Sequence, residues 1–162
     1  MRVIDFHNHY YPPKYMQALQ SGQSSVKVTI DKDGNPNLHY PGDYNIAVRG
    51  HRDLAYRDQV LASNGVTMQV VTLTTPGTHV ETPAAAARLA SMVNDEFKVA
   101  METRGERFTA LATLPLNDPA ASLKEFRRAT GELGMRGAML FSNINGVALS
   151  DGGAVFTTTD GG

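Results

Sequence analysis

The chain has 162 residues, 41% of them hydrophobic, a formal net charge of −1 at pH 7 and no cysteine. This length suits one domain with its own core. The balanced charge argues against nucleic acid or an anionic membrane as the main partner, the lack of cysteine excludes disulfides and thiolate sites, and no apolar run is long enough to span a bilayer. We therefore expect a globular protein of the cytoplasm.

The first half of the chain predicts a strand, an insertion and a helix, in that order. The strand covers residues 2–7. The insertion, at roughly residues 22–48, is polar and rich in turn residues, with DKDGNP between VKVTI and NLHY, and is interpreted as a hairpin. A helix from about Asp53 to Asn64 follows it.

Beyond residue 66, strand-like and helix-like segments alternate. Short apolar strands are predicted at residues 66–73, 107–116 and 136–142. The first two strands flank a helix whose ends are marked by Thr82-Pro83 and Gly105. The last two flank a helix that begins at Asp118-Pro119 and ends at Gly134. Its predicted inner face consists of Leu123, Phe126, Thr130 and Leu133.

Alternating strands and helices predict parallel strands joined by right-handed crossovers. About four such βα units occupy residues 1–150, roughly half of the ~250 residues that a complete eightfold barrel needs. We therefore predict an α/β fold that forms the N-terminal half of a TIM-type (β/α)8 barrel, with the hairpin insertion after its first strand. Residues 151–162, rich in Gly and Thr, are predicted to form an irregular tail. The open strand edges of the half-barrel's parallel sheet predict a homodimer.

The opening stretch VIDFHNHYYPP places polar side chains at alternate positions. In an extended chain Asp5, His7 and His9 share one face, and burying them is costly unless they are hydrogen-bonded or bind something. Both histidines lie at the carboxyl end of the strand, where ligands gather in parallel α/β folds. Two neutral imidazoles there can reach one divalent ion, with Asp5 in support. The alternative is a pair of hydrogen-bonded structural histidines.

These residues resemble the opening of the amidohydrolase superfamily. More narrowly, they are similar to the amidohydrolase-related branch that contains aminocarboxymuconate-semialdehyde decarboxylase, resorcylate-type decarboxylases and some lactone hydrolases. The resemblance continues through ASNGVTMQVVTLTTPG, RLASMVNDEFKVAMETRGERF and RFTALATLPLNDPAASLKEFRRATGELGMRGAMLFSNINGVALSD. It covers residues 1–151 in order and identifies the chain as an N-terminal fragment of such a barrel.

The resemblance implies a single divalent metal ion, zinc first and manganese as the alternative, with His7 and His9 as ligands. The remaining ligands and the catalytic groups are then expected beyond residue 162. The implied activity is metal-dependent, non-oxidative decarboxylation of an unsaturated or aromatic acid, so the partner is a small acidic substrate. Two alternatives remain open: a metal-dependent hydrolase of a lactone or ester, and an inactive, truncated half-barrel.

Three further residues are candidates for the substrate site. The resemblance places Arg49 where an arginine grips the substrate carboxylate; the alternative is a solvated arginine, with Arg52 and Arg57 equally available. His79, in the loop after the second strand, is a candidate substrate contact or an ordinary loop histidine. Asn143, at the end of the strand at 136–142, either lines the pocket or makes the turn.

Overall fold

The computed structural model describes residues 1–141, 147–149 and 155–157. Its helices are α1 (Pro13–Gln20), α2 (Arg49–Arg52), α3 (Leu54–Ser63), α4 (Pro83–Arg104) and α5 (Pro119–Gly131). Its strands are β1 (Ile4–Asp5), β2 (Lys27–Ile30), β3 (Pro36–Tyr40), β4 (Asp43–Ile46), β5 (Met68–Val71), β6 (Phe108–Ala110), β7 (Val147–Leu149) and β8 (Val155–Thr157). No helix in these ranges is long and apolar enough to cross a membrane.

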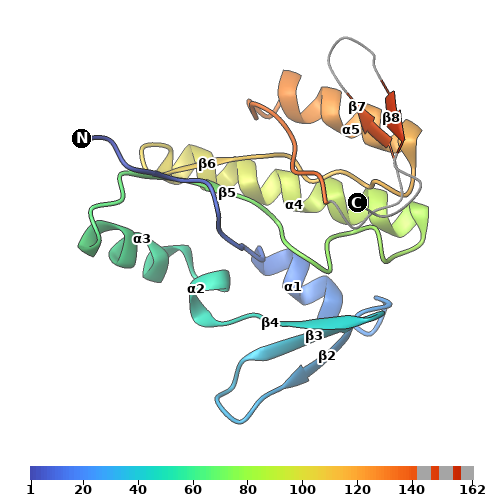
Figure 1. The fold of residues 1–162 in the computed structure, drawn as a ribbon. Coiled ribbons are helices and arrows are strands. Elements are labelled where there is room, and N and C mark those ends of the chain that lie inside the picture. The colour runs from blue at the N-terminus through green and yellow to red at the C-terminus, as the bar shows by residue number, and fades with distance from the viewer. Residues whose placement is uncertain (142–146, 150–154, 158–162) are drawn as a thin grey trace.

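A parallel sheet of order β1-β5-β6 carries the fold (Figure 1). Ile4 pairs with Met68, and Gln69 pairs with Phe108. A single parallel bridge between Ala112 and Ala138 extends the series. Because α3, α4 and α5 separate these segments along the chain, the predicted α/β order with parallel strands is confirmed. The carboxyl ends of β1 and β5 therefore lie side by side.

The helices begin where the sequence provides caps. The Asp53 carboxylate accepts the backbone N–H of Tyr56 at the start of α3, and the Asp118 carboxylate accepts that of Ala121 at the start of α5. Pro83 occupies the first position of α4, where its missing N–H costs nothing. The buried side of α4 consists of Ala86, Leu89, Ala90, Val93, Asn94, Phe97 and Ala100.

The core lies where α1 and α4 meet the sheet. Tyr11 and Tyr15 of the α1 segment are buried, as are Phe97 of α4 and Phe108 of β6. The Tyr11 hydroxyl donates to the carbonyl of Thr75, and the Tyr15 hydroxyl donates to that of Gly77. These two bonds hold the loop after β5 against α1.

The insertion differs from the predicted hairpin. β2, β3 and β4 form a three-stranded antiparallel sheet, in which a second turn at Gly42, with φ +85°, follows the first. Glycine suits this backbone conformation, and Pro41-Gly42 is a turn signal in the sequence. α1 was also not predicted, although Tyr15, Met16 and Leu19 bury one side of it.

Three predictions in the last third of the chain need correction. The buried residues of α5 are Ser122, Glu125 and Ala129, whereas the predicted Leu123 is exposed. Of the other predicted residues, Phe126 packs against the core, and Leu133, just after the helix, belongs to the core. The strand predicted at 136–142 is reduced to the bridge at Ala138. β8 pairs antiparallel with β7 inside the segment predicted to be irregular, where Val155, Phe156 and Thr157 favour a strand.

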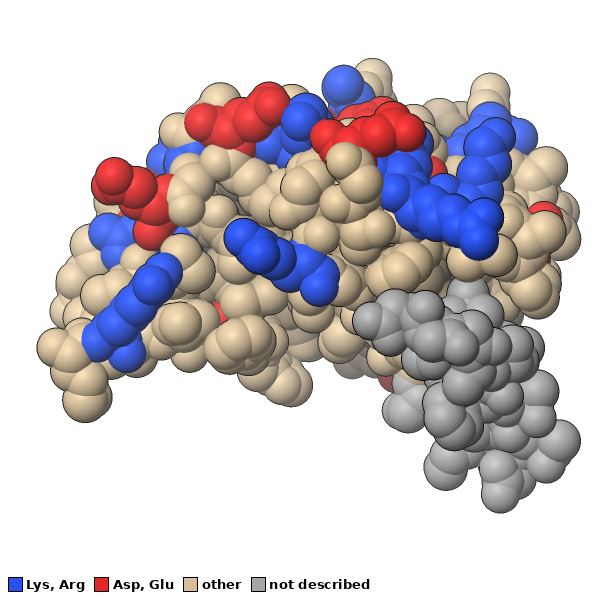
Figure 2. Space-filling view, turned by 90° about the horizontal axis from the view of Figure 1, so that it is seen from above, with Lys and Arg blue, Asp and Glu red and all other residues tan. Residues whose placement is uncertain are grey.

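The charge distribution agrees with the near-zero net charge. On the face seen in Figure 2, basic and acidic side chains lie interspersed, and neither sign dominates.

Candidate metal and substrate site

The candidate site begins where β1 ends. The backbone N–H of His7 donates to Oδ1 of Asp5 at 3.0 Å. The other carboxylate oxygen of Asp5 accepts Nε2 of Gln69, on the neighbouring strand β5, at 2.5 Å. The Asp5 side chain therefore fixes the backbone that carries His7.

The predicted pair of histidines is close together. The ring centroids of His7 and His9 are 5.7 Å apart, and both residues line a cavity of about 50 Å³ at the carboxyl ends of β1 and β5. The other lining residues are Phe6, Asn8, Thr72, Leu73, Thr74 and Met139. This cavity suits an ion or a water molecule, whereas pockets for drug-sized ligands measure about 300–1,000 Å³. The cavity is too small for an aromatic acid.

A third histidine, which sequence reasoning did not place here, joins the pair. His51 of α2 has its ring centroid 5.4 Å from that of His9. Nδ1 of His51 lies 3.2 Å from the carbonyl of Ile46; because a carbonyl only accepts, this contact favours the proton on Nδ1. Residues 6–50, which include α1 and the insertion, separate His51 from β1, and no local pattern indicates that the two would meet.

Burial lowers the pKa of two of these imidazoles, His9 and His51. It lowers the pKa of His9 below 6.5, and the nearby His7 and Arg57 add to the effect. Burial also lowers the pKa of His51, with His9 and Arg57 contributing, against the opposing bond to Ile46. A neutral imidazole is the form that binds a metal ion.

Arg57 lies beneath the histidines and is 6% exposed. It makes five hydrogen bonds: Nε and Nη2 to the carbonyl of Gly50, Nη2 also to the carbonyl of His9, and Nη1 to Oδ1 of Asn8 and Oε1 of Gln69. A guanidinium has five N–H groups. In this arrangement none remains for a substrate carboxylate, so Arg57 is a poor substitute for Arg49.

The structure places the Arg49 side chain against Asp53 and Tyr56 at the start of α3. Its Nε donates to the Asp53 carboxylate at 3.0 Å, and its guanidinium lies over the Tyr56 ring at 4.6 Å. The side chain is 68% exposed. Its two terminal nitrogens have no hydrogen-bond partner among the described residues, which leaves them available to a carboxylate at the rim.

His79 packs against Phe141, the last residue of the described range 1–141. Its ring centroid is 5.5 Å from that of Phe141, and its Nδ1 is buried without a partner among the residues described. Burial lowers its pKa. Asn143, the remaining candidate, lies outside the described residues.

His7 and His9 fit part of a metal site. Their same-side rings and the cavity between them suit a divalent ion, and imidazole is a common ligand of zinc and other transition metals. A catalytic zinc site normally has three protein ligands. Within residues 1–141 no group of three His, Cys, Asp or Glu side chains is arranged to hold a metal. The pair formed by His7 and His9 is therefore smaller than a complete zinc site.

Three decarboxylases of known name are similar to part of this chain in sequence. No family model matches the chain. It is 31% identical over 104 residues to the gamma-resorcylate decarboxylase of Rhizobium radiobacter, covering 62% of this chain and 32% of that protein. It is 28% identical over 141 residues to the 6-methylsalicylic acid decarboxylase of Aspergillus aculeatus, covering 86% and 37%. The match to the 2-amino-3-carboxymuconate-6-semialdehyde decarboxylase of Dictyostelium discoideum is 36% over 69 residues, covering 43% and 19%. The chain thus spans well under half the length of these relatives.

Solved structures share the fold. The Metarhizium anisopliae IDCase in apo form superposes with a TM-score of 0.73 at 21% identity, over 86% of this chain and 42% of that one. The dihydroxybenzoic acid decarboxylase of Polaromonas sp. JS666, with bound manganese and the inhibitor 2-nitroresorcinol, gives a TM-score of 0.65 at 22% identity, over 91% and 40%. The chain has the fold of part of these solved structures. In sequence it is similar to part of the decarboxylases named above.

Proposed function

We propose that this chain supplies the histidine pair of a metal-dependent, non-oxidative decarboxylase that acts on an aromatic or unsaturated acid. The observation that carries the proposal is the convergence of His7 and His9 on one small cavity at the carboxyl ends of β1 and β5. The sequence relatives, which decarboxylate resorcylate, methylsalicylate and carboxymuconate semialdehyde, support it. In this proposal, residues 1–150 are the N-terminal half of a TIM-type barrel.

In this proposal His7 and His9 hold one divalent ion, zinc or manganese; manganese is present in the Polaromonas neighbour. A bound ion of this kind supplies Lewis acidity and orients the acid. The remaining ligands, and the group that delivers a proton, come from outside the present sequence. The overall change is protonation of a substrate carbon, cleavage of its bond to the carboxylate and release of carbon dioxide.

Two residues of the chain are proposed to meet the substrate. The terminal nitrogens of Arg49 would donate two parallel hydrogen bonds to the carboxylate, the geometry in which guanidinium binds best. This requires the Arg49 side chain to leave the Tyr56 ring, at small cost because it is largely exposed. His79, in the loop after β5, would contact the rest of the ring.

The proposed setting is the cytoplasm, with a small acidic substrate as ligand, no nucleic acid or membrane partner, and a second copy of the chain as protein partner. The lack of cysteine agrees with a reducing compartment. The sheet edge at β1 supports the dimer, because Ile4 and Phe6 beside it are 39% and 69% exposed.

The test is product analysis with the purified natural protein that carries this sequence, because the remaining ligands and the proton donor are proposed to come from outside it. The protein is loaded with Mn²⁺ or Zn²⁺ and given 2,6-dihydroxybenzoate, 6-methylsalicylate and a simple aryl lactone in turn. Release of carbon dioxide that needs the metal and disappears in His7→Ala and His9→Ala supports the proposal. Opening of the lactone without carbon dioxide would assign the chain to the hydrolases. Failure of both reactions at every metal would mean an inactive half-barrel and would overturn the proposal for this chain.

A further inference from the structure

The Arg57 guanidinium is a buried cation without an acidic partner. It is 6% exposed, and it forms no ion pair with any carboxylate among the described residues. Its five hydrogen bonds all go to neutral oxygens. Burying a charge is costly, so such an arrangement needs a reason beyond filling space.

The acceptors of Arg57 belong to the three segments that surround the histidine pair. Asn8 and His9 follow β1, Gln69 lies on β5, and Gly50 lies in α2 next to His51. One rigid, planar group therefore ties the carbonyl of His9 to the turn that carries His51. The two rings meet at 5.4 Å because their backbones share this donor.

The same network reaches His7 by a second route. Oε1 of Gln69 accepts from Arg57, while Nε2 of Gln69 donates to Asp5, whose other oxygen accepts the backbone N–H of His7. Arg57, Gln69 and Asp5 thus form a continuous chain from the backbone of His9 to the backbone of His7. Asn8, between the two histidines, is held as well: it accepts from Arg57 and donates to the carbonyl of Val70 at 2.7 Å.

We propose that Arg57 is the positioning residue of the histidine pair: its hydrogen bonds set the backbone, and so the ring directions, of His9 directly and of His7 through Gln69 and Asp5. The inference rests on the proposed function, in which the two rings hold a metal ion. Groups that orient metal ligands in this way typically account for about 10–100-fold in metal affinity. Arg57 does not touch the substrate, because its N–H groups are all engaged.

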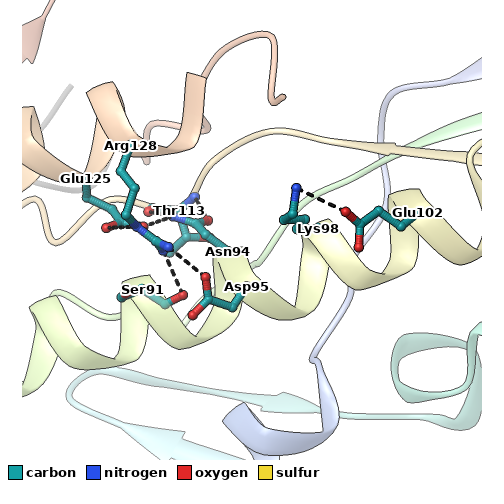
Figure 3. A network of polar contacts seen from close by, with 8 residues as sticks. All are labelled: Ser91, Asn94, Asp95, Lys98, Glu102, Thr113, Glu125 and Arg128. Atoms are coloured by element: carbon teal, nitrogen blue, oxygen red, sulfur yellow. Dashed lines mark hydrogen bonds and ion pairs between the residues drawn. The ribbon is translucent and has the colours of Figure 1, made fainter. Parts of the chain in front are cut away.

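The first test compares Arg57→Lys with Arg128→Lys. Lysine keeps the charge but has three donors on a flexible stem, so it cannot reproduce five bonds. Arg128 is the matched control: it makes two hydrogen bonds to Glu125 on its own helix α5 and two to Ser91 and Asp95 on α4, away from the histidines (Figure 3). Both variants are expected to lower the melting temperature.

Mn²⁺ affinity then separates a positioning role from a structural one. Titration calorimetry is expected to show a dissociation constant raised by about 10–100-fold in Arg57→Lys and by less than about twofold in Arg128→Lys. An Arg57→Lys protein that folds and binds Mn²⁺ like the unmodified chain overturns the inference. Should Arg57→Lys not fold, Gln69→Met replaces it: it leaves the Arg57–His9 bond in place, cuts the route to His7, and is expected to weaken Mn²⁺ binding in the same direction.

A metal-free readout keeps this inference distinguishable from the proposed function. Imidazole ¹⁵N and ¹³C signals of His9, recorded by NMR, are expected to shift or broaden in Arg57→Lys and to stay unchanged in Arg128→Lys. If the unmodified chain binds no Mn²⁺ yet its His9 signals respond in this way, the proposed function fails and the positioning role stands. If the His9 signals are the same in all three proteins, the positioning role fails whatever the metal does.

Discussion

His79 gives a pH dependence at the scale of a single residue. Burial holds its pKa below 6.5, because the charged form loses its hydration. Between that lowered pKa and 6.5 the unfolded chain binds more protons than the folded one, so this contribution to stability is lost as the pH falls through this window. We expect His79→Phe to lose less melting temperature between pH 7 and pH 5 than the unmodified chain. An identical loss in both proteins would contradict the assignment.

Gly77 is a second residue whose surroundings can be tested singly. Its φ is +64°, and a Cβ added there would lie 2.8 Å from Cε2 of Phe141 and 3.1 Å from Nδ1 of His79. Gly22 is the matched control, with φ +77° and no atom within 4 Å of the added Cβ. Gly22→Ala is expected to cost about 1–2 kcal/mol from backbone strain alone. Gly77→Ala should cost roughly 1–3 kcal/mol more, because overpacking adds to the strain. Urea unfolding of both variants measures the difference between their free energies of unfolding. Equal losses of stability would mean that the loop after β5 accommodates the added methyl group without overpacking.

Between elements, the polar contacts of α4 fix the exit of β6 (Figure 3). Asn94 is fully buried; its Oδ1 accepts the backbone N–H of Thr113, and its Nδ2 donates to the carbonyl of Thr113 and to the Glu125 carboxylate. Asn94→Leu leaves these groups without partners and is expected to destabilise the fold by about 2–4 kcal/mol. Lys98→Ala, which removes an exposed pair with Glu102 on the same helix, is expected to cost at most about 1 kcal/mol. Thermal unfolding measures the melting temperature of both variants. Equal losses of melting temperature would show that the hydrogen bonds of Asn94 to Thr113 and Glu125 do not stabilise the fold.

The sequence predicts elements whose signals are local. The helix starts at Asp53 and at Asp118-Pro119, and the helix bounds at Thr82-Pro83 and Gly105, each depend on neighbouring residues only, and each is found in the structure. The face of α5 was predicted only in part: Phe126 packs against the core, whereas the buried Glu125 accepts a hydrogen bond from Asn94, a partner 31 positions away. The spacing of His7 and His9 predicted that both would lie on one side, and both line one cavity. His51 and Arg57 contact His9 only because of the path of the insertion, which no local pattern encodes.

For the whole molecule, the exposed apolar side chains beside β1 predict self-association. Phe6 is 69% exposed at this edge. We expect light scattering coupled to size exclusion to give twice the mass of one chain, and Phe6→Asp to give the mass of one. Val99→Asp, at a side chain 56% exposed on α4, is the control and should leave the dimer intact. A single-chain mass for the unmodified protein at high concentration would rule out the dimer.

The central claim is that His7 and His9 share one metal ion. Crystals grown with Mn²⁺ and measured at the manganese absorption edge test it most directly. We expect one anomalous peak in the cavity between the two rings, roughly 2 Å from a nitrogen of each. Crystals of His9→Ala should lack that peak. A peak elsewhere, or none while both rings form hydrogen bonds to protein groups, would make them structural histidines and contradict the account.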